Sequence, residues 1–216
     1  MSVTYNHPSL VTSGMIMCLD AANPRSYPGT GTTIYDATGN GYNGTLVNGP
    51  TYSTANGGVI TVDGINDYID VPGINLSTSS YTIFGAARYV TVSGRIINAK
   101  GNNWLMGHWG GTTENYYAEG WVSASSAGAA DTNWRIYAAT WNSSTDQAAL
   151  YTNGVLTSGP NTSASAGPNG LGIGCYIPGG TEWSNGQFGF VMAYNTVLTA
   201  DQITQNFTAL RGRYGI

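Results

Sequence analysis

Short runs of β-branched and aromatic residues, separated by glycine, proline, asparagine, aspartate and serine, extend along most of this chain. Runs of this kind, bounded by turn-forming residues, are typical of β-strands. Because no helical periodicity separates them, we predict an all-β sandwich or barrel. The runs are Gly14–Asp20, Val59–Val62, Tyr68–Val71, Tyr81–Tyr89, Arg95–Ala99, Trp104–Trp109, Tyr116–Ser123, Trp134–Trp141, Ala148–Tyr151, Leu171–Tyr176 and Gln187–Tyr194.

Length and composition favour one folded domain. The chain has 216 residues, which one all-β sandwich can occupy. Only 8% of them are charged, but 41% are hydrophobic and 12% aromatic, enough to drive the formation of a core. Lysine and arginine total 7 against 11 aspartates and glutamates, and no basic cluster is present to neutralise phosphates. We therefore expect no nucleic-acid partner.

The N-terminal residues differ from the strand-rich middle of the chain. Residues 1–12 are polar, and Pro8 interrupts any regular element, so we expect an N-terminal arm outside the fold. The single β-sandwich domain is then expected at residues 13–216. The first apolar run, Met15–Leu19, is too short for a signal-peptide core or a membrane span. We therefore expect synthesis in the cytoplasm and no membrane partner.

Two local patterns predict defined elements. Asn153 and Gly154 tolerate the positive φ angles of a tight turn, so they predict a β-hairpin between the runs on either side. Thr199 and Gln202 have the spacing of a capping box, which predicts one short amphipathic helix at about residues 199–213. The apolar stripe of this helix is predicted to be Ile203, Phe207 and Leu210.

Five groups of motifs occur in an order that is typical of one known family. They are Leu19-Asp20-Ala21-Ala22-Asn23-Pro24 with Tyr35-Asp36 and Asn43-Gly44; Val62-Asp63-Gly64; Trp134-Arg135-Ile136-Tyr137; Leu150-Tyr151 with Asn153-Gly154; and Phe190-Val191-Met192-Ala193 with Leu198-Thr199. Over roughly residues 14–210 the chain resembles the laminin-G-like, concanavalin-A-like lectin/glucanase superfamily, in the form found in bacteriophage structural proteins. The resemblance implies a jelly-roll sandwich of two antiparallel sheets.

The same resemblance implies a function based on binding and display. The first hypothesis is a non-catalytic virion structural protein, a capsid decoration or tail-associated subunit on the virion surface. Its expected partners are a capsid or tail protein, further copies of itself and a host-surface glycan. The alternative is a free carbohydrate-binding module, and a glycoside hydrolase ranks third because the sequence lacks the carboxylate pair that it would need.

Carboxylate pairs are the feature that a glycosidase on this fold needs. The chain has three glutamates, Glu114, Glu119 and Glu182. Glu114 and Glu119 are nearest to a laminarinase-type motif, but Tyr116 occupies its aspartate position, and the five-residue spacing puts the two carboxylates on opposite faces of a strand. On this basis the sequence predicts that the chain is not an enzyme.

Metal and thiol chemistry have few candidates. Calcium could be held by Asp63, Asp67 and Asp70, which follow one another near a turn, but Asp63 and Asp67 also fit ordinary turn formers that cap their own backbone. No cofactor is therefore predicted, with calcium as the one candidate. Cys18 and Cys175 are expected to be free thiols, because the cytoplasm disfavours disulfides.

An aromatic-rich stretch carries the strongest functional signal. Sugars present apolar C–H faces and hydroxyl rims, so aromatic rings next to hydrogen-bonding side chains suit them. An alternative is that these aromatics belong to the core or to a subunit contact. The candidate carbohydrate-binding residues are Trp104, His108, Trp109, Asn115, Tyr116, Trp121 and Trp183.

Overall fold

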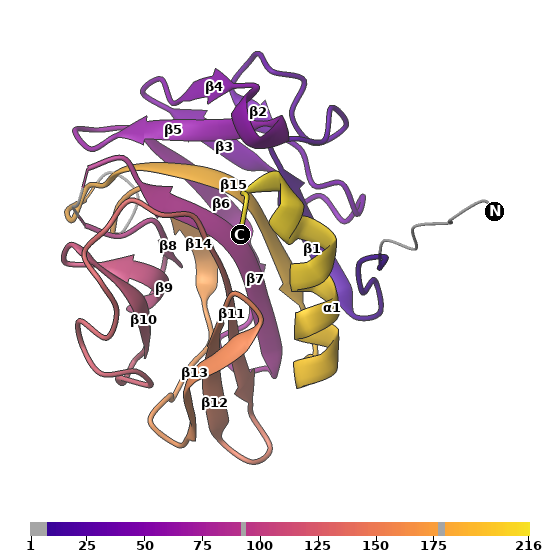
Figure 1. Ribbon diagram of the computed structural model, residues 1–216, viewed down its shortest axis with the longest axis vertical. Helices are drawn as coiled ribbons and strands as arrows, with labels where there is room; N and C mark the ends of the chain where they lie inside the picture. Colours follow the sequence, from indigo (N-terminus) through magenta and orange to yellow (C-terminus); the bar gives the residue numbers. More distant parts are fainter. Residues whose placement is uncertain (1–7, 92–93, 177–179) are drawn as a thin grey trace.

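The computed structural model describes residues 8–91, 94–176 and 180–216, and within them the strands form two antiparallel sheets packed as a sandwich (Figure 1). One sheet has the order β13 (Val155–Asn161), β12 (Gln147–Thr152), β11 (Arg135–Asn142), β7 (Tyr81–Tyr89), β15 (Asn185–Tyr194), β5 (Val59–Asp63) and β4 (Thr51–Ser53), and β1 (Met15–Asp20) also pairs with β15. We call this the eight-stranded sheet.

The second sheet has seven strands. Their order is β10 (Thr112–Ala118), β9 (Trp104–Trp109), β8 (Ile97–Ala99), β14 (Asn169–Ile173), β6 (Tyr68–Asn75), β3 (Gly44–Val47) and β2 (Thr33–Ile34). The predicted all-β sandwich is confirmed. The sequence pattern missed β2, β3 and β4, because strands of two to four residues give too little alternation to recognise.

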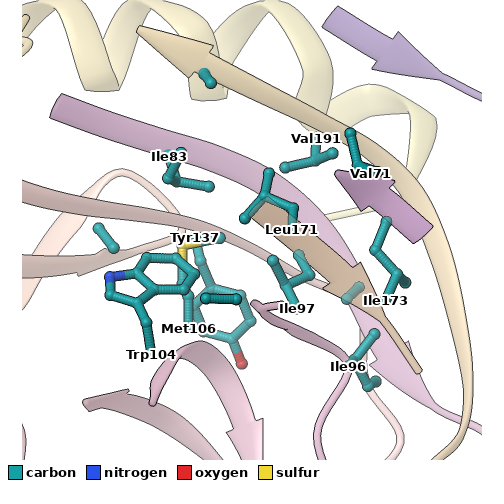
Figure 2. Close-up of a cluster of buried hydrophobic side chains, with 14 of the residues drawn as sticks. Val71, Ile83, Ile96, Ile97, Trp104, Met106, Tyr137, Leu171, Ile173 and Val191 are labelled. Carbon is teal, nitrogen blue, oxygen red and sulfur yellow. The ribbon is translucent and has the colours of Figure 1, made fainter. Parts of the chain in front are cut away.

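The core lies between the sheets, and strict alternation decides which side chains enter it. Ile97 and Ala99 of β8 point inward, and so do Trp104 and Met106 of β9. Figure 2 shows Trp104 and Met106 beside Tyr137 of β11, with the aliphatic side chains of several strands around them. The residues between these positions therefore face away from the core, on the outward face of the seven-stranded sheet.

A second hydrophobic cluster covers the outer face of the eight-stranded sheet, where α1 (Ala200–Leu210) packs across β15 and β7 (Figure 1). Thr199 forms the predicted capping box with Gln202, so the predicted C-terminal helix is confirmed. It continues as a 3₁₀ turn at Arg211–Arg213. Ile203 and Leu210 are buried as expected, whereas Phe207 is only half-buried. None of the described helices is long and apolar enough to cross a membrane.

The N-terminal segment departs from the predicted arm. Residues 1–7 lie outside the described residues, but the chain from residue 8 onward packs against α1. Val11 is buried, and its backbone N–H donates to the side-chain Oδ1 of Asn206 at 2.8 Å. The backbone carbonyl of Ser9 accepts a hydrogen bond from Gln205. The expectation that all of residues 1–12 lie outside the fold is therefore wrong for Ser9–Val11.

Two turn motifs have clear structural roles. The predicted hairpin joins β12 to β13, and its turn residues Asn153 and Gly154 have positive φ angles of 52° and 79°. The segment after Tyr35 covers the edge of β1: Asp36 Oδ1 accepts the N–H of Cys18, and Thr38 donates to the carbonyl of Ile16. Exposed strand edges promote aggregation, so these contacts explain why a polar motif follows β1.

Candidate aromatic binding face

The outward face of the seven-stranded sheet is the natural place for a ligand, because α1 covers the outward face of the other sheet. Register places one row of residues side by side across it. The neighbours of each row residue along its strand point into the core, so the row itself points outward. The row consists of Tyr117, Leu105, Asn98, Gly172 and Asp70. Its middle residues Leu105, Asn98 and Gly172 are buried, and only the two end residues are half-exposed.

Three aromatic side chains gather at the β9–β10 end of this face, and we call Trp109, Tyr117 and Trp121 the aromatic cluster. The ring of Trp121 lies 5.1 Å from the ring of Trp109 and 5.1 Å from that of Tyr117, with tilted edge-to-face geometry. All three side chains are half-buried. Rings that are held by their neighbours and still partly exposed provide rigid apolar contact area.

A turn after β10 positions Trp121. The N–H of Ala118 donates to the carbonyl of Gly120, and Glu119 takes a positive φ of 54°, so the chain reverses direction there. Trp121 then pairs with Tyr117 as an isolated bridge. The returning segment runs along β10, so it covers an edge of the seven-stranded sheet and brings the indole onto the outward face.

Two of the residues predicted to bind carbohydrate, Trp104 and Tyr116, are fully buried in the core. Trp104 Nε1 donates to the Tyr81 hydroxyl at 2.8 Å, and the hydroxyls of Tyr81 and Tyr116 are 2.6 Å apart. The Tyr116 hydroxyl also reaches the backbone carbonyl of Thr140 at 3.2 Å. This network satisfies polar atoms inside the core, so these two side chains present no surface to a glycan.

His108 and Asn115 are also buried. The imidazole lies between the rings of Tyr89 and Tyr137, and burial lowers the pKa of His108 to about 3, so it is neutral at physiological pH. The Oδ1 of Asn115 accepts the backbone N–H of Ser126 at 2.9 Å. In this structure both residues hold the interior and the loop together, and neither offers a hydrogen-bonding group to solvent.

Trp183, the remaining candidate, is half-buried and belongs to a different aromatic pair. Its ring lies 6.0 Å from that of Tyr68, which points outward from β6. The structure thus brings Trp109 and Trp121 together and leaves Trp183 outside their cluster. Tyr117 was not among the predicted residues, although it follows Tyr116 directly.

Three cations near this face are engaged by carboxylates. Arg95 forms an ion pair with Glu182 and also donates to Asn103 Oδ1 at 2.7 Å, while its guanidinium lies 3.9 Å from the centre of the Tyr176 ring. Lys100 Nζ lies 2.7 Å from Asp70 Oδ2.

The third cation is Arg135, beside the start of β10. It forms a two-bond pair with Asp131, at 2.7 and 2.9 Å, and this contact lowers the pKa of Asp131 to about 2. Glu114 lies on the other side of the same guanidinium, at 3.7 Å. Glu119, the other member of the predicted broken motif, is exposed and accepts the backbone N–H of Asn103.

The calcium candidates make turn and ion-pair contacts. Asp63 Oδ1 accepts the backbone N–H of Ile65 at 2.8 Å and those of Asn66 and Asp67 at 3.2 and 3.3 Å, and these bonds lower the pKa of Asp63. This is the geometry of the turn-former alternative. In the part of the chain that is described, no group of three His, Cys, Asp or Glu residues is arranged to hold a metal. That no cofactor is bound, with calcium as the one candidate, stays a prediction.

Sequence comparison identifies the class to which this sandwich belongs. Residues 63–204 match the model of the Concanavalin A-like lectin/glucanases superfamily, which is more than half of the chain. The chain therefore belongs to the concanavalin A-like lectin/glucanase superfamily. A search of the curated proteins found no match.

Solved structures share the same fold. Trypanosoma rangeli sialidase in complex with sialic acid matches with a TM-score of 0.68 and 14% identity, over 95% of this chain and 34% of the sialidase chain. Domain 4 of AbnA, a GH43 extracellular arabinanase from Geobacillus stearothermophilus, in complex with arabinotriose, matches with a TM-score of 0.66 and 19% identity, over 90% of this chain and 98% of that one. The binding domain of Paraclostridial Mosquitocidal Protein 1 matches with a TM-score of 0.64 and 16% identity, over 90% and 52%.

These comparisons contradict the prediction that the chain is not an enzyme. Two of the three structures described above come from enzymes, a sialidase and an arabinanase. At 14% and 19% identity the likeness concerns the fold, and this chain spans about a third of the sialidase. Because one fold can host both enzymes and binding proteins, a missing carboxylate motif in the sequence does not separate this chain from enzyme-related families.

Proposed function

We propose that this chain is a carbohydrate-binding domain, and that the aromatic cluster is where the sugar sits. The observation that carries the proposal is the arrangement of Trp109, Tyr117 and Trp121 on an outward sheet face, where all three are half-buried and Trp121 contacts both of the other rings. Aromatic rings held in this way can stack on the C–H face of a sugar. The match to an arabinanase domain in complex with arabinotriose, over almost the full length of both chains, supports the proposal.

The loops beside the cluster supply polar groups at short range. Glu119 is exposed and lies two residues from Tyr117. The backbone N–H of Asn103 donates to Glu119 Oε1, and the backbone N–H of Glu119 donates to the carbonyl of Asn103. Sugar sites combine such hydrogen-bonding groups with flat apolar surface. The Glu119–Asn103 pair would therefore contact the hydroxyl rim of a sugar whose face rests on the cluster.

Trp121→Ala is expected to weaken binding to immobilised neutral oligosaccharides about tenfold, because it removes the central ring of the cluster, a loss of about 1.4 kcal/mol. Binding is measured by surface plasmon resonance or on a glycan array, with arabinotriose as the first probe. Tyr35→Ala is the control, since Tyr35 is an exposed aromatic residue, 49% exposed, that lies outside the aromatic cluster just before the segment that covers β1. Equal binding by wild type and Trp121→Ala would contradict the proposal.

We also propose that the domain is displayed in many copies on a virion surface, attached to a capsid or tail protein after synthesis in the host cytoplasm. The support is the resemblance of the segments around Leu19–Asn43 and Phe190–Ile203 to bacteriophage structural proteins. A single aromatic site gives weak affinity, and multivalent display raises avidity by roughly 10²–10⁴. A free carbohydrate-binding module is the alternative.

Mass spectrometry of purified particles is expected to detect this chain in many copies per particle if the display proposal is correct. An antibody against the folded domain should then label intact particles. A chain found only in the soluble fraction, encoded next to polysaccharide-degrading enzymes, would instead support the free carbohydrate-binding module.

A further inference from the structure

We infer that the aromatic cluster selects uncharged sugars and discriminates against carboxylated or sulfated ones. This inference rests on the proposed function and adds the chemical class of the ligand. The positions of the cations determine this selectivity, because an anionic sugar is normally recognised by lysine or arginine side chains that can pair with it.

Arg95 contacts Asn103, which contacts Glu119 beside the aromatic cluster, and the charge of Arg95 is already neutralised. Arg95 is 5% exposed, and its guanidinium is occupied by Glu182, the Asn103 side chain and the face of Tyr176. To bind a sugar carboxylate, Arg95 would have to leave Glu182, and separating a largely buried ion pair leaves an uncompensated charge behind. Arg95 therefore supports the sheet face without offering a binding site for an anion.

The other two cations near this end of the sandwich also have carboxylate partners, although the side chain of Lys100 is 36% exposed whereas that of Arg135 is largely buried. Lys100 is held by Asp70, and Arg135 by Asp131 with Glu114 close by. In each case the carboxylates equal or outnumber the cation. An incoming anion would compete with a carboxylate that is tethered in place, so these side chains favour neutral ligands.

The remaining arginines lie on other surfaces. Arg88 lies over Trp134, in the hydrophobic cluster on the outer face of the eight-stranded sheet, and Arg213 pairs with Asp20 of β1. Arg211 belongs to the turn after α1, and Arg25 follows β1. All seven lysines and arginines of the chain are in the described part.

An exposed negative charge stands beside the cluster instead. Glu119 is exposed and comes two residues after Tyr117. Its Oε1 accepts a backbone N–H, a contact that leaves the second carboxylate oxygen available to accept from a sugar hydroxyl. A ligand carboxylate or sulfate at this position would meet like charge, whereas a neutral sugar would find an acceptor.

The test uses sialyllactose and glucuronosyl-xylotriose, each paired with the neutral methyl ester of its carboxyl group so that the two members of a pair have the same sugar skeleton, together with arabinotriose. Binding of the full chain is measured at about 0.01 M and about 1 M salt, where the Debye length falls from about 30 Å to about 3 Å. The neutral member of each pair is expected to bind about tenfold more tightly at low salt, about 1.4 kcal/mol, and the difference should shrink at high salt.

Two variants test whether the ion pair of Arg95 and the exposed carboxylate of Glu119 cause the preference for neutral sugars. Glu182→Gln releases Arg95 and is expected to raise binding of the acidic sugars several-fold at low salt, with binding of the neutral sugars within twofold of wild type. If its thermal transition shows that Glu182→Gln is unfolded, Glu119→Gln serves instead, because it removes the exposed carboxylate and should raise acidic binding more than neutral binding. Acidic sugars that bind wild type as tightly as their neutral partners would overturn this inference and leave the proposed function intact. If the wild-type protein bound no sugar at all, both the proposed function and this inference would be contradicted.

Discussion

Replacing Trp104 with alanine is expected to lower the free energy of unfolding by about 3–5 kcal/mol, a large share of the 5–15 kcal/mol that stabilises a typical domain. The indole is fully buried between the sheets, beside Met106 and Tyr137 (Figure 2). It also contacts the rings of Tyr81 and Tyr116 edge-on. Its removal leaves a cavity and takes a hydrogen-bond donor from the Tyr81 hydroxyl.

Trp109→Ala is the matched control, because Trp109 is at the other end of the same strand and faces outward. We expect this substitution to cost less than half as much stability as Trp104→Ala, and to weaken sugar binding instead. Urea denaturation followed by far-UV circular dichroism gives both free energies. Similar losses for the two variants would show that Trp109 supports the core as much as Trp104 does, which would weaken the case for a binding surface.

These two tryptophans also show how much of the site can be predicted from the sequence. Alternation in the run Trp104–Trp109 separates Trp104 from Trp109 onto opposite faces, and the structure agrees. The sequence could not tell which face is the core, because almost every residue of the run is apolar or aromatic. The position of a sheet relative to its partner depends on tertiary packing, which local patterns do not contain.

Tyr116 and Tyr117 show a second limit. The turn pairs Thr112 with Trp109, and a regular register from there would place Tyr116 opposite Leu105 on the outward face. Instead β10 contains an extra residue near Glu114, whose φ is 62°, and the register shifts so that Tyr117 pairs with Leu105. A one-residue bulge thus exchanges a predicted binding residue for its neighbour, and the sequence carries no clear signal for it.

The fold as a whole was more predictable than the site. Turn residues such as Asn153-Gly154 and the capping box at Thr199 depend on short-range chemistry, and both elements formed where they were expected. The binding face depends on ion pairs between residues far apart in the chain, such as Arg95 with Glu182. No spacing rule connects those two positions.

The contact between the N-terminal segment and α1 is another long-range feature, and it leads to the second large expected effect. Asn206 is fully buried on α1, 195 residues away from Val11. Its Oδ1 accepts the N–H of Val11, and its Nδ2 donates to the hydroxyl of Tyr194 at 3.0 Å. That hydroxyl in turn donates to the carbonyl of Val11, also at 3.0 Å, so three residues close a buried ring of hydrogen bonds.

Asn206→Ala is expected to cost about 2–4 kcal/mol, because it leaves a buried N–H without its acceptor and the Tyr194 hydroxyl without a donor. Amide hydrogen exchange should show the local effect directly, as a loss of protection at Val11. Tyr194→Phe removes the hydroxyl from this ring but keeps the Asn206 acceptor for Val11 and adds no buried charge, so it should retain more of this protection. Gln205→Ala is the control, since Gln205 makes an exposed contact with Ser9, and its cost should stay below about 1 kcal/mol. If Asn206→Ala and Gln205→Ala had equally small effects, the segment before β1 would not depend on α1 for its position, and the original prediction of an arm outside the fold would apply to Val11 as well.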